Sequence, residues 1–167
     1  MAYYNEIAPI YNQLHGEEQL RKLRAIHAFL TEHKLITTSD TILDVGCGTG
    51  LSAQVFKNNI VGVDPAQELL KQASFKTVCA RAEQLPFPDN SFDVVLCITA
   101  LHNCDDPCQA IAEMKRVGKR IWVITLLKKS AKRAQLEKLL STRFRIVKVI
   151  DDVHDRVFFA RNMTLNG

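Results

Sequence analysis

The sequence predicts an α/β fold with a mainly parallel sheet and an antiparallel hairpin near its end. Short runs rich in β-branched residues alternate with segments of helical periodicity along the 167 residues. The run from Phe92 to Ile98 is apolar at nearly every position, as expected of a strand buried on both faces of a parallel sheet. Asp151, Asp152 and Asp155 lie between the last two β-rich runs, which favours a tight antiparallel connection.

The expected elements follow one another without a linker or an internal repeat. Residues from about 3 to 33 have apolar side chains near helical spacing, with Gly16 as an interruption. Seven strands are expected after this segment, at about 41–45, 59–63, 76–80, 92–98, 120–127, 144–150 and 156–160. Helices are expected between them at about 51–57, 66–74, 107–117 and 130–140, the third capped by Asp105 or Asp106.

Length and composition suit one globular domain, with 47% apolar and 24% charged residues. No apolar run approaches the ~20 residues that cross a bilayer, and the N-terminus lacks the layout of a signal peptide, so a cytoplasmic protein is expected. Five cysteines, an odd number, argue against a disulfide framework. His102, Cys104 and Cys108 lack the paired spacing of a zinc site, so no metal is expected.

The charges are unevenly distributed along the chain. Between Met114 and Val149 there are twelve Lys or Arg residues and one acid, Glu137, whereas the whole chain carries a net charge of +4. Such asymmetry favours an anionic partner. On charge alone, a solvated surface of helices and strand ends explains it equally well.

The strongest signal for a ligand is the segment Asp44-Val45-Gly46-Cys47-Gly48-Thr49-Gly50, between an expected buried strand and a helix. Glycine permits positive φ and close approach of a ligand, and ligands of parallel sheets bind beyond the carboxyl ends of the strands. The spacing is G-x-G-x-G, not the G-x-G-x-x-G of dinucleotide sites. The Asp44 carboxylate would repel a diphosphate but suits a ligand amino group, directly or through water.

A second acid, Asp64, ends the second expected strand, about 20 residues after the first strand ends. At such a place a carboxylate can accept hydrogen bonds from ribose hydroxyls. One such acid alone is more often a loop or helix cap. Because Asp44 and Asp64 stand at matching strand ends, the pair favours a ligand site.

Three segments together resemble the class I S-adenosylmethionine-dependent methyltransferases, in the type 11 group that includes ubiquinone-biosynthesis-like enzymes. They are Leu43–Gly50, Gly62–Asp64 and Arg81–Asp93, with a weaker echo in Tyr4–Asn12. The resemblance covers residues from about 40 to 127 and is specific for the cofactor, not for the methyl acceptor.

The resemblance implies a Rossmann-like three-layer sandwich whose seven strands have the order 3-2-1-4-5-7-6. It also implies one domain over residues 1–167. Within it, 1–35 would form an N-terminal helical cap, 40–127 the cofactor-binding core, and 128–167 a helix with the closing strands.

Roles for individual residues also follow from the resemblance. Asp44 and the Gly46 backbone would hold the methionine amino group, while Gly48 and Gly50 would let the cofactor lie against the turn. The other positions expected at the cofactor are Asp64 for the ribose diol, the Ala82 N–H for adenine N1, and Cys47, Pro65, Glu83 and Cys97.

One position departs from the family pattern. Many relatives have an acid where this chain has Arg81, and that acid accepts from the adenine amino group. Arginine cannot accept a hydrogen bond. Either Glu83 or a backbone carbonyl takes over, or adenine binds more weakly.

In the family, the segment that follows the fourth strand borders the transferring methyl group; here it reads Thr99-Ala100-Leu101-His102-Asn103-Cys104. His102 is a candidate for orienting or deprotonating the acceptor, and equally for a structural loop residue. Tyr11 and Tyr4 are candidates for closing over the cofactor, with packing at the edge of the fold as the alternative.

The acceptor is predicted from what the chain lacks. Thr99–His102 replaces the Asn/Asp-Pro-Pro-Tyr/Phe tetrad of enzymes that methylate planar nitrogens, and no lid separates the strand ending near Leu127 from the next helix. An open mouth rimmed by basic residues suits RNA, such as tRNA or rRNA, because phosphate neutralisation supplies much of the affinity. The basic residues expected to start that helix at the mouth are Lys128, Lys129, Lys132 and Arg133.

Other functions stay open at this point. Small-molecule or protein methylation is the main alternative, and a non-catalytic S-adenosylmethionine-binding module is another. A nicotinamide-dependent oxidoreductase is disfavoured by the glycine spacing and by Asp44. Because several minimal RNA methyltransferases rely on a small zinc-ribbon activator, this short chain is also a candidate for such a partner.

Overall fold

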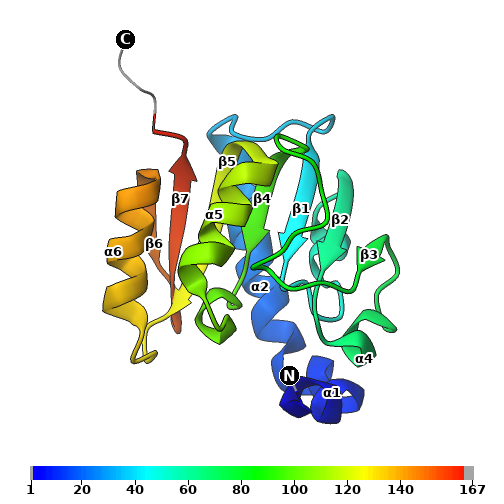
Figure 1. Cartoon of the computed structure of the whole chain (residues 1–167). Helices are drawn as coiled ribbons and strands as arrows, with labels where there is room; N and C mark the ends of the chain where they lie inside the picture. The colour runs from blue at the N-terminus through cyan, green and yellow to red at the C-terminus, as the bar shows by residue number, and fades with distance from the viewer. Residues whose placement is uncertain (1, 164–167) are drawn as a thin grey trace.

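Seven strands form a single mixed sheet in the computed structural model, which describes residues 2–163. They are β1 (Thr41–Val45), β2 (Asn59–Val63), β3 (Thr77–Val78), β4 (Phe92–Cys97), β5 (Gly118–Leu127), β6 (Arg145–Asp151) and β7 (Asp155–Arg161). Their order across the sheet is β3-β2-β1-β4-β5-β7-β6 (Figure 1). The first five run parallel, and β7 is antiparallel to both β5 and β6. The expected order and closing hairpin are confirmed.

Helices cover both faces of the sheet and complete a three-layer sandwich, as expected (Figure 1). They are α1 (Ala2–Ile7), η1 (Ala8–Ile10), α2 (Tyr11–Glu32), α3 (Ser52–Val55), α4 (Gln67–Leu70), η2 (Leu101–Asn103), α5 (Pro107–Val117) and α6 (Arg133–Arg143). The helices α5 and α6 lie on one face, and α2 with α3 on the other. The short α1 lies near α4, at the carboxyl end of the sheet.

Alternation along the strands divides the apolar core between the two faces. In β1, Leu43 packs on the face of α5 and α6, whereas Ile42 packs on the face of α2. Leu30 of α2 and Trp122 of β5 are fully buried on opposite sides. Because each buried large apolar side chain contributes about 1.5–3 kcal/mol, both faces hold the sheet to its helices.

Several elements differ from the expected limits. Gly16 does not interrupt α2: it is buried, a Cβ there would meet only Asn12 Cβ at an ordinary distance of 3.5 Å, and the helix continues through it. The helix expected from residue 130 begins at Arg133, since Ser130 accepts the N–H groups of Lys132 and Arg133 and forms a turn instead. Three elements, α3, α4 and β3, are shorter than expected, with four, four and two residues.

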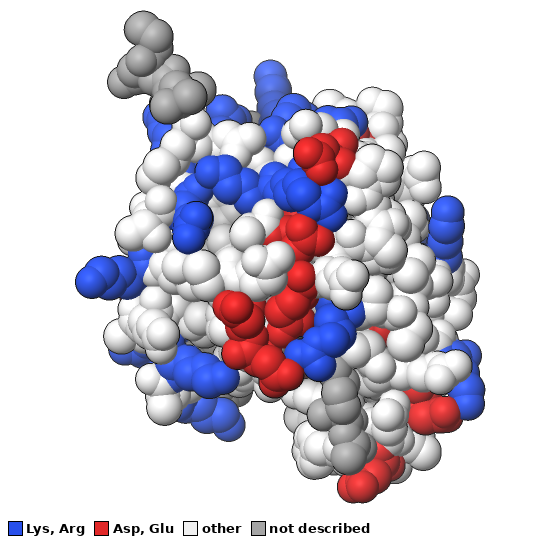
Figure 2. All heavy atoms as spheres, in the orientation of Figure 1, with Lys and Arg blue, Asp and Glu red and all other residues white. Residues whose placement is uncertain are grey.

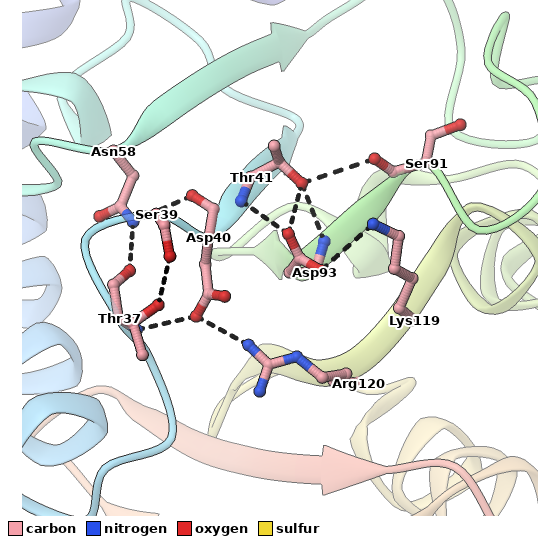
Figure 3. A network of polar contacts seen from close by, with 9 residues as sticks. All are labelled: Thr37, Ser39, Asp40, Thr41, Asn58, Ser91, Asp93, Lys119 and Arg120. Carbon is pink, nitrogen blue, oxygen red and sulfur yellow. Dashed lines mark hydrogen bonds and ion pairs between the residues drawn. The ribbon is translucent and has the colours of Figure 1, made fainter.

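A polar network joins the amino ends of β1, β4 and β5 (Figure 3). The Asp93 carboxylate accepts from the Thr41 N–H at 2.9 Å, from the Thr41 hydroxyl at 2.8 Å and from Lys119 at 3.2 Å. Nearby, Asp40 accepts from the Thr37 N–H and pairs with Arg120 at 2.7 Å. Each acid in this network therefore faces a cation as well as neutral donors.

Among the helices of residues 2–163, none is long and apolar enough to cross a bilayer. The single domain expected over residues 1–167 and its three parts stay a prediction. Met1 and residues 164–167, at the limits of that domain, lie outside the described part of the chain.

Candidate functional site

A pocket of about 820 Å³, the open space at its mouth included, lies beyond the carboxyl ends of β1, β2 and β4. Eight of the residues expected at the site line the pocket: Tyr11, Gly46, Gly48, Asp64, Pro65, Ala82, Glu83 and Cys97. The topology therefore brings together residues from five separate segments of the sequence.

The turn after β1 is shaped by three glycines with positive φ, which are Gly46 (76°), Gly48 (55°) and Gly50 (82°). A Cβ on Gly46 would lie 2.4 Å from the Cβ of Ala100, so the turn and the segment after β4 approach each other too closely for a side chain. Gly48 lines the pocket. Gly50 does not, because its α-carbon packs against Phe75, where a Cβ would come within 2.4 Å of the ring.

Asp64 joins the two turns at the pocket. Its Oδ2 accepts from the Gly48 N–H at 2.9 Å, and its Oδ1 accepts from the Ala66 N–H at 2.7 Å. Burial raises the pKa of Asp64, while these two N–H groups act to lower it. The carboxylate therefore holds the glycine turn against the segment after β2 and still faces the pocket.

Asp44 lies deeper than Asp64 and is 4% exposed. Its Oδ2 accepts from the Ser52 hydroxyl at 2.5 Å, and burial raises its pKa to about 6. Asp44 and Cys47 line a smaller cavity that shares Gly46 with the main pocket. The expected contact of Asp44 with a ligand amino group thus concerns this inner cavity.

Arg81 lies at the pocket edge and pairs with other side chains there. Its guanidinium donates to Asp105 at 2.5 Å and to Glu83 at 3.3 Å. The same Glu83 oxygen accepts from the backbone N–H groups of Asp105 and Asp106. Because this oxygen already accepts three hydrogen bonds, it is poorly placed to replace the acid that the family has at position 81.

Two tyrosines of the N-terminal segment line the pocket beside the glycine turn. The ring centroids of Tyr4 and Tyr11 are 6.4 Å apart, and the Asn103 amide donates to the Tyr4 hydroxyl at 3.0 Å. Burial raises the pKa of Tyr11 to about 12, so its hydroxyl keeps its proton. Asn103 lines the pocket too, and it belongs to the Thr99–Cys104 segment that the resemblance places beside the methyl group.

His102 is not among the residues that line the pocket. Its Nδ1 is buried without a hydrogen-bond partner among the described residues, and burial lowers its pKa. Lys132 donates to its backbone carbonyl at 3.3 Å. Within residues 2–163, no three His, Cys, Asp or Glu side chains are grouped to hold a metal ion.

The basic residues after β5 lie at the same end of the sheet as the pocket, but most contact the protein itself. Lys128 donates to the Asp152 carbonyl, and Arg133 donates to the Lys128 carbonyl at 3.0 Å. Lys129 and Lys132 are exposed. On the face in Figure 2, the Lys and Arg side chains form separate groups with a group of acids between them, so the basic stretch of sequence is not one continuous basic surface there.

Sequence reasoning placed Thr99 in the segment beside the methyl group but missed the buried residues behind it. Thr99 follows β4, lines the pocket and has a φ of +55°. Its hydroxyl accepts from the buried Lys22, which pairs with Asp155. Lys22 stands beside Arg21 in a helix with several charged side chains, and Asp155 was expected only in a turn, so neither gave a signal.

A family model for a methyltransferase domain, of type 11, matches residues 43–121. The demethylmenaquinone methyltransferase of Renibacterium salmoninarum is 29% identical over 126 residues, which cover 71% of this chain and 53% of that protein. The methyltransferase-domain match and this relative support a class I S-adenosylmethionine-dependent methyltransferase of the type 11 group. The chain spans about half the length of this curated relative.

Solved structures share the fold of this chain. Magnesium protoporphyrin IX methyltransferase from Synechocystis PCC 6803, with bound SAM, superposes with a TM-score of 0.72 at 17% identity, covering 87% of this chain and 80% of that one. A chain in the complex between the Haloferax volcanii Trm112 methyltransferase activator and a methyltransferase gives 0.68 at 14% identity, covering 95% and 97%. At these identities the likeness concerns the fold alone.

Proposed function

We propose that this chain binds S-adenosylmethionine in the pocket beyond β1, β2 and β4 and transfers its methyl group to an acceptor at the pocket mouth. The observation that carries this is the meeting of the glycine turn with Asp64 in one pocket. Gly48 offers a surface without a side chain, and Asp64 offers carboxylate oxygens at the lining. These features fit a ligand with a ribose and a compact, positively charged chain.

The acids of the site complement a cation. Asp44 and Asp64 are buried, and neither pairs with a Lys or Arg among the described residues. A ligand ammonium near Asp44 would favour its ionised form, because an opposite charge lowers the pKa of a carboxyl. When bound, the cofactor supplies an already activated methyl group, so the protein's task is alignment. Orientation of this kind contributes up to roughly 7–11 kcal/mol.

We assign different duties to the two catalytic candidates. Tyr11 lines the pocket and keeps its proton, so it can donate a hydrogen bond and cover the cofactor but does not serve as a base. His102, whose pKa is lowered, is neutral near pH 7 and can accept a proton. Because it lies outside the pocket lining, its role concerns the acceptor and depends on movement of η2.

For the acceptor we favour RNA or another component of translation. Between β5 and α6 there are only the turn residues 128–132, so no inserted lid covers the pocket in the described chain. Lys129 and Lys132 are exposed at that turn. The intermingled acids on the face of Figure 2 argue for a small basic contact rather than a long RNA track.

A second candidate acceptor is a small molecule, and a relative favours it. The matching enzyme from Renibacterium salmoninarum is named for demethylmenaquinone. An open pocket with apolar lining residues such as Leu69 and Ile98 would admit an apolar acceptor.

We also propose a small zinc-ribbon activator as a partner. The solved complex with a Trm112 activator contains a chain of similar length and fold, which supports the idea. Affinity purification of the full chain from its native cells, followed by mass spectrometry, tests it; recovery of the chain without a small partner contradicts it.

Transfer of labelled methyl groups tests the function directly. The purified chain is incubated with methyl-labelled S-adenosylmethionine and separate RNA, protein and metabolite fractions from native cells. We expect label in the RNA fraction, and much less label with Asp64→Asn when the cofactor concentration is near the wild-type dissociation constant. Label only in metabolites would overturn the RNA acceptor, and no cofactor binding by calorimetry would overturn the methyltransferase activity itself.

A further inference from the structure

Two opposite charges are buried together behind the pocket. Lys22 of α2 and Asp155, the first residue of β7, are 1% and 0% exposed, and their charged atoms are 2.5 Å apart. Removing two charges from water costs free energy that their attraction only partly offsets, so a buried pair is weak evidence for stability. A role in fixing one conformation is the better explanation to test.

The conformation in question is that of Thr99. The Lys22 ammonium donates to the Thr99 hydroxyl at 2.9 Å, and the Thr99 N–H donates to the hydroxyl of the fully buried Thr125 at 2.7 Å. Thr99 has a φ of +55°. A β-branched residue is an outlier there and persists only where its surroundings hold it. Hydrogen bonds with buried residues behind the pocket therefore fix both the backbone and the side chain of Thr99.

Thr99 in turn positions the pocket wall. Thr99, Ala100 and Asn103 all line the pocket. Ala100 packs directly on Gly46, at a separation that leaves no room for a Cβ on that glycine. Any change of φ at Thr99 would move Ala100 relative to the glycine turn. A continuous series of contacts thus joins the buried pair to Thr99, and Ala100 to the glycine turn that we propose for the cofactor.

We propose that Lys22 and Asp155 are positioning residues, which hold Thr99 in its left-handed conformation and thereby set the shape of the cofactor pocket. This inference rests on the proposed function for its ligand, though the effect on Thr99 is independent of any ligand. The two residues act through Thr99 and do not touch the cofactor.

The chain offers a matched control. Arg21, the neighbour of Lys22, forms an ion pair with Asp152 at 2.7 Å, so it links the same helix to the same closing hairpin. Its side chain is 48% exposed and does not contact Thr99. If the buried pair merely ties α2 to the hairpin, the control pair should have comparable effects.

The experiment compares Lys22→Met/Asp155→Asn with Arg21→Met/Asp152→Asn. The first pair of changes removes both buried charges together, so no uncompensated charge is left to unfold the protein. Amide hydrogen exchange of Thr99–Asn103 is followed by NMR, and binding of S-adenosylhomocysteine by calorimetry. We expect the buried-pair variant to unfold cooperatively, yet to show exchange and dissociation constants raised about tenfold or more, since small misplacements in a site have large effects.

A rescue variant separates positioning from general packing. Glycine adopts positive φ without support, so adding Thr99→Gly to Lys22→Met/Asp155→Asn should recover most of the affinity that the buried-pair variant loses. Wild-type exchange at Thr99–Asn103 in the buried-pair variant, or equal effects in the control, would overturn the inference. If the wild-type chain fails to bind S-adenosylhomocysteine, the proposed function fails, and the exchange data alone decide the role of the pair.

Discussion

The acids at the amino end of the sheet differ in their ion-pair partners from those beside the glycine turn. At the amino end, Asp40 and Asp93 pair with Arg120 and Lys119, and backbone N–H groups donate to them as well (Figure 3). At the carboxyl end, Asp44 and Asp64 accept only from N–H and hydroxyl groups. Asp40 and Asp93 have their cations within the fold, whereas Asp44 and Asp64 have none among the described residues. The difference supports our proposal that a positively charged ligand binds at the carboxyl end.

The largest expected effect comes from closing the glycine turn. Gly46→Ala places a Cβ 2.4 Å from Ala100 at a φ of +76°. The left-handed conformation alone costs about 1–2 kcal/mol. We expect affinity for S-adenosylmethionine to fall more than about 100-fold in calorimetry, because the turn must shift. As a control, Gly16→Ala, in the middle of α2, should stabilise the chain by up to about 1 kcal/mol; unchanged binding by Gly46→Ala would contradict the site.

The second-largest effect is expected when one acid at each end of the sheet is replaced and the two variants are compared. Asp64→Asn weakens hydrogen bonds from the Gly48 and Ala66 N–H groups at the pocket, and Asp93→Asn weakens those from Thr41. Hydrogen bonds to charged groups are worth about 1.5–3 kcal/mol. We expect Asp64→Asn to lower cofactor affinity about 10- to 100-fold, and Asp93→Asn to lower only the free energy of unfolding. Urea titration measures the free energy of unfolding, and cofactor titration measures the affinity. Equal losses of affinity in the two variants would contradict the difference between the two ends.

The pH dependence of stability should also differ in sign between the ends. Backbone and hydroxyl donation from Thr41 lowers the pKa of Asp93 to about 2, so its contribution is present above about pH 4 and is lost as pH falls toward 2. Burial raises the pKa of Asp44 to about 6, so the folded state binds more protons than the unfolded state between pH 4 and 6. Its contribution therefore falls as pH rises through that range, by about 3 kcal/mol.

Urea unfolding at a series of pH values checks both signs. Asp44→Asn should remove the decline between pH 4 and 6, and Asp93→Asn should remove the loss below pH 4. A decline that persists in Asp44→Asn would assign it to another group.

The smallest effect is expected for Arg120 at the amino end. Its side chain is 47% exposed, although it pairs with Asp40 at 2.7 Å. Exposed pairs contribute about 0–1 kcal/mol because water and salt screen them. Arg120→Gln should thus change the free energy of unfolding by less than about 1 kcal/mol and leave cofactor binding unchanged. A larger change, measured by urea titration, would mean that the two ends are coupled.

Most of the fold could be predicted from local sequence patterns. The apolar runs predicted β1, β2 and β4 closely, since a buried parallel strand has few alternatives, and the Asp44–Gly50 segment predicted the turn. The ends of elements that depend on a single residue were not predicted. Gly16 remained helical because its surroundings allowed it, and the hydrogen bonds of Ser130 delayed the start of α6.

At the site, the residues adjacent to strand ends were predictable, and those that support them were not. Asp64 and Gly48 follow recognisable strands, and the structure places both at the pocket. Lys22 and Asp155 are 133 positions apart, and only the path of the chain brings them together behind Thr99. Burial of a lysine on a helix depends on which face meets the sheet, which the sequence pattern of α2 leaves undecided.

The position of β7 between β5 and β6 has a consequence for synthesis of the protein. A growing chain that has emerged only as far as β6 already contains the glycine turn and Asp64, but it lacks the partner of Lys22 and the strand that covers β5. The ribosome must therefore release the chain through β7 before Thr99 gains its full support. Maturation of the pocket would thus follow the synthesis of β7, after the segment with the glycine turn has been made.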